Sequence, residues 1–320
     1  MSERAYVHQA LLGDGSLILS IDERLRGLAA QWMPSLPETR ATAHAPSASI
    51  RVDAGTAGQH PEDGPHSISL GHVRAWVNSA AGNARLRSED ASISAEVDLN
   101  KRVAEVSVDE TNASIADVTS ALTIITAFLL VRAGMTPIHA AGVVHPDSGR
   151  AWLLAGDSHS GKSTTTANLV RAGWSYLSDD YVVLGLRDDG EVTVEGWPDD
   201  FHLDEGFHAG ESTGIRGTLR ESALRPGSRV SSSLLHGVLF PRVSPGEPTL
   251  LSGVAPVVTL ERLIRQSPWL MADSASAAKV LALLGNAASG WNGELRLGSD
   301  TFANPSLLDT LVREFAARSS

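Results

Sequence analysis

The sequence contains no cysteine among its 320 residues, and this absence narrows the chemistry open to the protein. Without thiols there can be no disulfide, no thiolate nucleophile and no cysteine-ligated zinc. Such a composition fits a cytoplasmic protein. Aromatic residues are also scarce, at 5%, but hydrophobic residues make up 42%, which is enough for a folded core.

Positively charged residues are also few compared with negatively charged ones. The chain carries 26 Lys and Arg against 37 Asp and Glu, a formal net charge of −11. Nucleic acids and anionic membranes need a basic surface, and no run of Lys and Arg supplies one. We therefore expect neither as a partner.

Long apolar runs are missing as well. The N-terminus has no cationic start and no long apolar core, so we do not expect a secretion signal there. The longest apolar stretch, residues 121–131, is too short to span a bilayer and ends at Arg132. We expect it to form a core helix.

Two regions differ in their patterning. Residues 1–113 contain short runs that alternate between polar and apolar residues, which predicts a β-rich N-terminal domain of mostly antiparallel strands. Within it, residues 34–66 are rich in Pro, Ala, Gly and Ser, and indicate a long loop or, equally, a few short edge strands. Residues 114–320 form the second predicted domain.

The second domain has the order expected of an α/β nucleotide-binding unit. A long helix ending at Gly134 precedes two apolar strands, which meet at a polar turn in residues 145–149. A glycine-rich loop, a helix that stops at Gly173 and another strand follow. This succession of strand, glycine loop, helix and strand is typical of nucleotide-binding proteins.

The glycine-rich loop matches the pattern G-x-x-x-x-G-K-[ST] through Gly156, Gly161, Lys162 and Ser163. Glycines let the backbone curl so that its N–H groups, and the positive end of the next helix, face one phosphate. Lysine adds charge on the β- and γ-phosphates, and the serine hydroxyl can bind Mg²⁺. The nucleotide-binding residues predicted from this loop are Gly156, Asp157, Ser158, His159, Ser160, Gly161, Lys162, Ser163 and Thr164.

Two adjacent acids, Asp179 and Asp180, interrupt an apolar run sixteen residues after Ser163. In a plain strand one of them would point into the core, because side chains alternate across the sheet. At a strand end, one carboxylate could hold a metal ion and the other could accept the proton of an attacking hydroxyl.

Residues 137–190 resemble the catalytic core of the HPr kinase/phosphorylase superfamily, which is related to the ATP-dependent phosphoenolpyruvate carboxykinases. The resemblance is carried by His139, the two strands, "GDSHSGKS", the helix with its Arg-Ala-Gly end, and the paired acids. It implies an α/β P-loop catalytic domain that follows the β-rich N-terminal domain. The N-terminal domain itself shows no specific match.

The resemblance also implies roles. Lys162 and the loop amides would hold the phosphates of ATP, and Ser163 with Asp180 would hold Mg²⁺. Asp179 would be the general base toward an acceptor hydroxyl, and His139 would lie near the transferred phosphate. Relatives form hexamers, so a homo-oligomer is also expected.

One departure concerns a family glutamate that aids metal binding in the signature E-I-R-G. This chain has Gly214 at that position, and Glu205 or Glu211 could take its place. The departure puts the carrier protein HPr in doubt as the acceptor, and with it the reverse reaction.

Three functions therefore stay open. The first is an ATP- and Mg²⁺-dependent kinase for a serine hydroxyl of a protein or peptide. The second is a small-molecule kinase whose acceptor pocket lies in the N-terminal domain. The third is a nucleotide-binding regulator without transfer activity.

Overall fold

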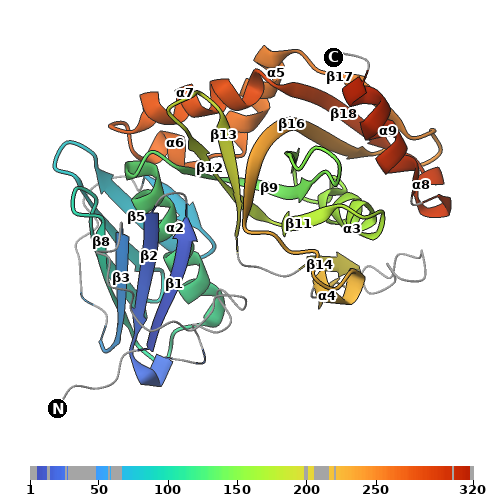
Figure 1. Cartoon of the computed structure of the whole chain (residues 1–320). Helices are drawn as coiled ribbons and strands as arrows, with labels where there is room; N and C mark the ends of the chain where they lie inside the picture. The colour runs from blue at the N-terminus through green and yellow to red at the C-terminus, as the bar shows by residue number, and fades with distance from the viewer. Residues whose placement is uncertain are drawn as a thin grey trace. The chain divides into compact units, whose positions relative to one another are not determined.

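The computed structural model divides the chain into two compact units, which are described separately below (Figure 1). The first unit contains residues 1–136 and 268–280, and the second contains residues 137–267 and 281–320. The described residues are 6–12, 15–25, 27, 48–56, 58, 67–197, 201–204, 216–219, 221–304 and 306–317.

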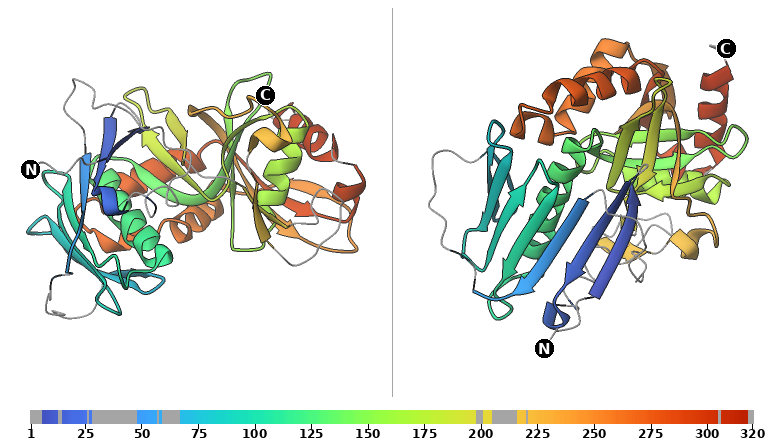
Figure 2. Two further views of the ribbon diagram at one scale, coloured as in Figure 1. Left: turned by 90° about the horizontal axis from the view of Figure 1, so that it is seen from below. Right: turned by 60° about the vertical axis from the view of Figure 1, so that its left-hand side comes forward.

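The first unit is built on an eight-stranded sheet, whose strands lie side by side in the order β1-β2-β3-β8-β7-β6-β5-β4 (Figure 2). Strand β3 pairs in parallel with both β2 and β8, and the remaining neighbours are antiparallel. The strands are β1 (Tyr6–Leu12), β2 (Gly15–Ile21), β3 (Ala48–Ala54), β4 (Ile68–Leu70), β5 (Val73–Asn78), β6 (Asn83–Ser88), β7 (Ile93–Asp98) and β8 (Val103–Val108), with a short 3-10 helix, η1 (Glu23–Leu25), after β2.

Helix α2 (Ile115–Arg132) packs against this sheet (Figure 1). Strands β6 and β8 alternate exposed and buried residues, so the sheet has one apolar face for the helix to cover. Ser114 caps the helix by accepting a hydrogen bond from the Asp117 N–H at 3.1 Å. By length and hydropathy α2 could cross a membrane, but 72% of it is buried, which is typical of a core helix.

The segment 268–280 completes the first unit through contacts with α2. The Trp269 ring, in α6 (Trp269–Ala272), meets Phe128 edge-to-face with the ring centroids 6.5 Å apart. The Arg132 guanidinium lies 2.7 Å from the Asp273 carboxylate, which is 2% exposed. Both contacts join residues more than 130 positions apart in the sequence.

Two features of the first unit differ from the sequence-based expectations. Strand β3 lies within the stretch predicted as a loop or edge strands, yet it is an interior strand between β2 and β8. Helix α2 groups with the first sheet, whereas the sequence placed the domain boundary before it, at residue 113. The helix is apolar around most of its circumference, and an apolar pattern alone does not say which sheet it covers.

The second unit has its own sheet, in which β10, β9, β12, β13, β16, β18 and β17 are consecutive neighbours and β11 pairs with β9. A further pairing between β10 and β16 closes a ring of five strands. The strands are β9 (Thr136–Val144), β10 (Ala151–Ala155), β11 (Ser175–Ser178), β12 (Tyr181–Leu186), β13 (Val192–Gly196), β16 (Ser232–Val243), β17 (Leu250–Gly253) and β18 (Trp291–Leu297). Beside this sheet, β14 (Phe201–Asp204) pairs with β15 (Arg216–Leu219).

Strands β10, β16 and β18 run parallel, so their carboxyl ends meet at one edge of the sheet. Every residue of β10 is buried, as expected of a parallel strand that is covered on both faces. Helices α3 (Lys162–Arg171) and α9 (Ser306–Ala317) share one core with these strands, around Trp152, Leu239 and Leu295. Further helices of the chain are α4 (Glu221–Leu224), α5 (Pro256–Arg265), α7 (Ala277–Ala288) and α8 (Asp300–Ala303).

Candidate functional site

The register of the strands brings the predicted site residues to one edge of the second sheet. Ala140 of β9 is opposite Ala155 of β10, so His139 lies beside Gly156, where the glycine-rich loop begins. Strand β9 also pairs with β11, whose last residue, Ser178, is opposite Gly142. The two acids follow directly. Residues that are distant in sequence are thus neighbours because β10 and β11 both pair with β9 and both end beside it.

The glycine-rich loop connects β10 to α3 as the sequence predicted. Gly156 and Gly161 have φ angles of +154° and +101°, and Gly161 occupies the N-cap position of α3 without a side-chain cap. The first N–H groups of a helix have no partner inside the helix, so these donors face the loop. The Ser160 hydroxyl is buried, with no hydrogen-bond partner among the described residues. The loop therefore has hydrogen-bonding capacity for an anion.

Lys162 is the first residue of α3, and its side chain is only 7% exposed. Its ammonium group donates to the carbonyl oxygens of Gly156 at 2.8 Å and Asp157 at 3.1 Å. A third contact, 3.1 Å long, joins it to Nε2 of His139. The positive charge is held at the mouth of the loop by neutral acceptors.

His139 connects this lysine to the acid pair. Its Nδ1 lies 3.3 Å from the Asp180 carboxylate, while its Nε2 faces Lys162. Burial lowers the pKa of His139, and the charge of Lys162 lowers it too, although Asp180 acts in the opposite direction. A neutral ring that accepts from Lys162 through Nε2 must carry its proton on Nδ1, from which it donates to Asp180.

Asp179 and Asp180 occupy the break between β11 and β12, where the sequence had suggested a single strand. Asp179 is 2% exposed, whereas the Asp180 side chain is 48% exposed. The pair consists of one buried and one accessible carboxylate, so the two acids have different environments.

Tyr181 is a member of the site that the sequence did not single out. Its ring meets His139 at a centroid distance of 5.5 Å and lies 6.2 Å from the ring of Trp197. Burial, helped by the charge of Asp180, raises the pKa of the Tyr181 hydroxyl to about 12. Its position directly after the acid pair was the only signal available in the sequence.

The structure describes the positions of some of the predicted metal ligands but not of all of them. Ser163 lies in the first turn of α3, next to Lys162, and its hydroxyl with the acid pair offers the oxygen ligands that Mg²⁺ prefers. Glu205 and Glu211 lie outside the described residues. Within the described residues, no three His, Asp or Glu side chains gather into a metal-binding group. A cation here would rely on few protein ligands, as is usual for Mg²⁺ bound with phosphates.

The remaining loop residues form the outer part of the site. Asp157, Ser158 and His159 are exposed, and His159 has a φ angle of +64°. Thr164 is partly buried and lies one residue beyond Ser163 in the helix. The structure therefore places all nine predicted loop residues between the end of β10 and the first turn of α3.

Comparisons with known proteins add little to this geometry. No protein-family model matches the chain, and no curated protein matches it. A solved structure, the Hpr(Ser) kinase/phosphatase from Coxiella burnetii, aligns with 57% of this chain and 97% of that chain at 15% identity. The TM-score is 0.35, so this is a distant structural likeness only.

Proposed function

We propose that the protein is an ATP- and Mg²⁺-dependent phosphotransferase that acts in the cytoplasm and phosphorylates the hydroxyl group of a serine in a protein or peptide. The observation that carries the proposal is the chain of contacts from the glycine-rich loop through Lys162 and His139 to Asp180. These contacts connect the glycine-rich loop, which has the pattern of a phosphate-binding loop, to a pair of carboxylates.

Lys162 is the residue that would recognise the nucleotide. An ammonium group that is 7% exposed and held by neutral acceptors is a strong donor to an anion that enters the loop. Phosphate oxygens would replace the carbonyl oxygens of Gly156 and Asp157 as its partners. The loop N–H groups and the Ser160 hydroxyl would bind the same phosphates.

Asp179 is the proposed general base. The acceptor oxygen would form a bond to the γ-phosphorus while the bond from that phosphorus to the β,γ-bridging oxygen breaks, which releases ADP. The proton of the acceptor hydroxyl would pass to the Asp179 carboxylate. Bound Mg²⁺ would neutralise charge on the β- and γ-phosphates.

Asp180 and Ser163 are the proposed magnesium ligands. The Nδ1–H of His139 would orient the Asp180 carboxylate, since the two groups are 3.3 Å apart. Most of the rate acceleration would come from positioning and electrostatics, since general-base help is typically worth about 10²–10⁴ in rate.

Substitution of each acid in turn tests the different roles proposed for Asp179 and Asp180. We expect Asp179→Asn to lower phosphoryl transfer by about 10²–10⁴ while it keeps the affinity for ATP. We expect Asp180→Asn instead to raise the Mg²⁺ concentration required for activity. Binding is measured by calorimetry, and transfer from γ-labelled ATP is measured with a cell lysate as the source of acceptor.

The labelled product decides between the three functions. A labelled polypeptide supports the proposal, and a labelled metabolite assigns the enzyme to small-molecule kinases. ATP binding without any labelled product would indicate a regulator. An Asp179→Asn variant with normal turnover would show that the base assignment is wrong.

A further inference from the structure

The sheet of the first unit has an apolar face and a polar face. Helix α2 contacts strands β4 to β8 on the apolar face, where Leu86, Ala95 and Val106 are buried. Side chains alternate across a strand, so the residues between these apolar ones point the other way. On β5 to β8 they include Arg74, Trp76, Arg85, Arg87, Glu96 and Glu105.

Two pairs of like charges lie directly opposite each other on the polar face. Arg74 of β5 is opposite Arg87 of β6. Glu96 of β7 is opposite Glu105 of β8. Like charges in such cross-strand pairs destabilise a sheet. The two pairs have opposite signs, so one ligand that carries both signs would compensate both of them.

Arg87 is the uncompensated member of the basic pair. Arg74 has Glu89 at 2.9 Å, whereas Arg87 has no ion-pair partner among the described residues, and its Nε is buried without a hydrogen bond. The residue opposite Arg87 on β7 is Ser94, whose hydroxyl accepts a hydrogen bond from the Gly58 N–H at 2.8 Å. A guanidinium group in this state is a strong donor to an oxyanion.

A cavity of about 250 Å³ gives access to the basic pair. It is lined by Arg74, Trp76, Arg87, Ser88 and Glu89. Its volume is below the roughly 300–1,000 Å³ of pockets that enclose a whole ligand, so it suits one group of a larger ligand. The Trp76 ring places an apolar surface beside the two guanidinium groups. An acidic side chain, with its methylene groups and its carboxylate, matches both features.

The acidic pair borders a second and wider cavity on the same face. This cavity has a volume of about 540 Å³ and lies over β6, β7 and β8, and its lining includes Arg85, Glu96 and Glu105. Lys101 and Asp98 also line it, and they pair with each other at 3.0 Å. The two cavities are neighbours, because Arg85 of the wide cavity is opposite Trp76 of the small one.

Glu105 is the uncompensated member of the acidic pair. Arg85 lies 3.6 Å from Glu96. Arg51 is opposite Glu105 on β3, but it pairs with Asp53 at 2.9 Å. Glu105 itself has no ion-pair partner in the part of the chain that the structure describes. Its carboxylate therefore remains for a cation from outside.

The register of the strands sets the distance between the two pairs. Because Arg85 is opposite Glu96, the acidic pair lies two strands across the sheet and two residues along it from the basic pair. With about 4.8 Å between strands and about 3.4 Å per residue, the separation is roughly 12 Å. An extended peptide covers this distance in about four residues, and side chains four positions apart point to the same side.

We infer that the polar face of the first sheet binds an extended peptide segment of mixed charge. An acidic side chain of the peptide lies between Arg74 and Arg87, and a basic side chain four positions away lies over Glu96 and Glu105. A free anion would compensate only the basic pair, whereas such a peptide compensates both. The inference goes beyond the proposed function and does not depend on it, because no nucleotide takes part.

The experiment titrates the ¹⁵N-labelled full-length protein, without nucleotide, with eight-residue peptides of Gly and Ser. Each peptide carries one Glu and one Lys four positions apart, in one order or the other. The readout is the indole N–H resonance of Trp76, which the Trp76→Phe variant assigns. We expect one order to bind with a Kd of about 5 mM or lower, and a peptide of Gly and Ser alone to bind at least about tenfold more weakly.

Charge reversal tests the contact itself. Arg87→Glu should weaken binding of the Glu-Lys peptide at least about fivefold, because the acidic side chain then meets a like charge. A peptide with Lys in place of its Glu should bind this variant at least about fivefold more tightly than it binds the wild-type protein. Arg265→Glu is the matched control, since Arg265 is 72% exposed on α5 of the second unit, and it should have no effect.

Glu105→Lys tests the other end of the peptide and replaces Arg87→Glu if circular dichroism shows that the latter does not fold. It should also weaken the Glu-Lys peptide at least about fivefold. The inference is overturned if neither peptide order shifts the Trp76 resonance, or if the folded variants keep the wild-type affinity. It is also overturned if acetate or inorganic phosphate alone binds as tightly as the peptides, because the site would then take a free anion. None of these failures changes the result expected for ATP binding.

Discussion

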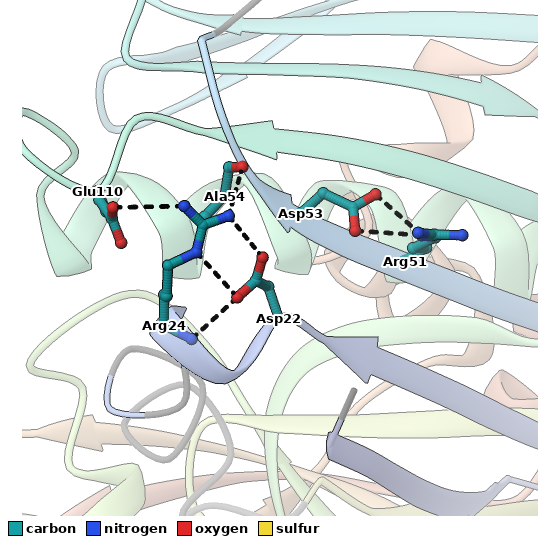
Figure 3. A network of polar contacts seen from close by, with 6 residues as sticks. All are labelled: Asp22, Arg24, Arg51, Asp53, Ala54 and Glu110. Atoms are coloured by element: carbon teal, nitrogen blue, oxygen red, sulfur yellow. Dashed lines mark hydrogen bonds and ion pairs between the residues drawn. The ribbon is translucent and has the colours of Figure 1, made fainter. Parts of the chain in front are cut away.

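The two units each contain an eight-stranded sheet, but they place their charged residues differently. In the first unit, most of the described ion pairs contain an exposed side chain, and Arg132 with Asp273 is the buried exception. Asp22 with Arg24 and Arg51 with Asp53 are two such pairs, at 2.8 and 2.9 Å, and Arg24 also faces Glu110 (Figure 3). In the second unit, Lys162 and Asp179 are almost fully buried, at the start of α3 and directly after β11.

This difference matters because exposed ion pairs are common on any protein surface, whereas buried charges are unfavourable and need a structural or functional reason. An exposed ion pair typically contributes about 0–1 kcal/mol. Burial of a charge costs several kcal/mol unless partners compensate, so buried charges that gather at one edge of a sheet indicate a functional site. The contrast predicts how substitutions in the two units should differ.

The largest effect is expected for the lysine of the loop. Lys162→Met should lower ATP affinity by at least about 100-fold, because the variant loses charged hydrogen bonds worth about 3 kcal/mol. Lys279→Met is the matched control, since Lys279 is exposed on α7 and should have no effect. Calorimetric titration with ATP and Mg²⁺ measures both, and equal affinities in the two variants would contradict the nucleotide site.

The next prediction tests whether burial also determines how much an ion pair of the first unit contributes to the stability of the fold. The Arg132 side chain is 15% exposed, and its partner, Asp273, is 2% exposed. Arg132→Ala should destabilise the protein by about 2–3 kcal/mol, because it leaves a buried carboxylate without its cation. Arg74→Ala removes an exposed pair with Glu89 and should cost less than about 1 kcal/mol.

Urea unfolding followed by circular dichroism measures this pair of variants. Equal losses of stability would mean that burial does not decide the contribution of these ion pairs, and the comparison between the units would fail.

The smallest effect concerns the network in Figure 3. Hydrogen bonds from Arg24, first from its side chain and then from its backbone N–H, lower the pKa of Asp22 to about 2. A carboxylate with a lowered pKa stabilises the fold above its unfolded-state pKa, near 3.9, and that stabilisation is lost as the pH falls toward 2. Because Arg24 is half-exposed, we expect only about 1 kcal/mol.

Asp22→Asn should therefore be about 1 kcal/mol less stable than the wild-type protein at pH 7, with the difference shrinking between about pH 5 and pH 2. Urea unfolding at pH 7, 5 and 3 checks this expectation. A difference that grows at low pH would have the wrong sign for a carboxylate with a lowered pKa.

Local patterns in the sequence predicted local structure well. The motif from Gly156 to Ser163 predicted a strand, a loop and a helix, and the structure has β10, the loop and α3 in that order. The turn between β9 and β10 and the end of α3 before Gly173 were also predicted, because Gly and polar turn residues act on the adjacent backbone alone.

Long-range arrangement was harder to predict. The parallel pairing of β3 with β2 and β8 depends on strand register across the sheet, which composition does not encode. The contact between His139 and Asp180, which are 41 positions apart, was not predicted, since the family resemblance gave each residue a separate role. The roles of Asp179, Asp180 and Ser163 remain predictions, and so does the identity of the acceptor.

The first unit is discontinuous in the sequence, and this has a consequence for its synthesis. Its closing segment ends at residue 280, which is 144 residues after residue 136 (280 minus 136). At about 5–20 residues per second, a ribosome needs roughly 7–30 s to add them. During that interval Phe128 and Arg132 lack Trp269 and Asp273, so the nascent chain displays an unfinished apolar helix to which chaperones can bind.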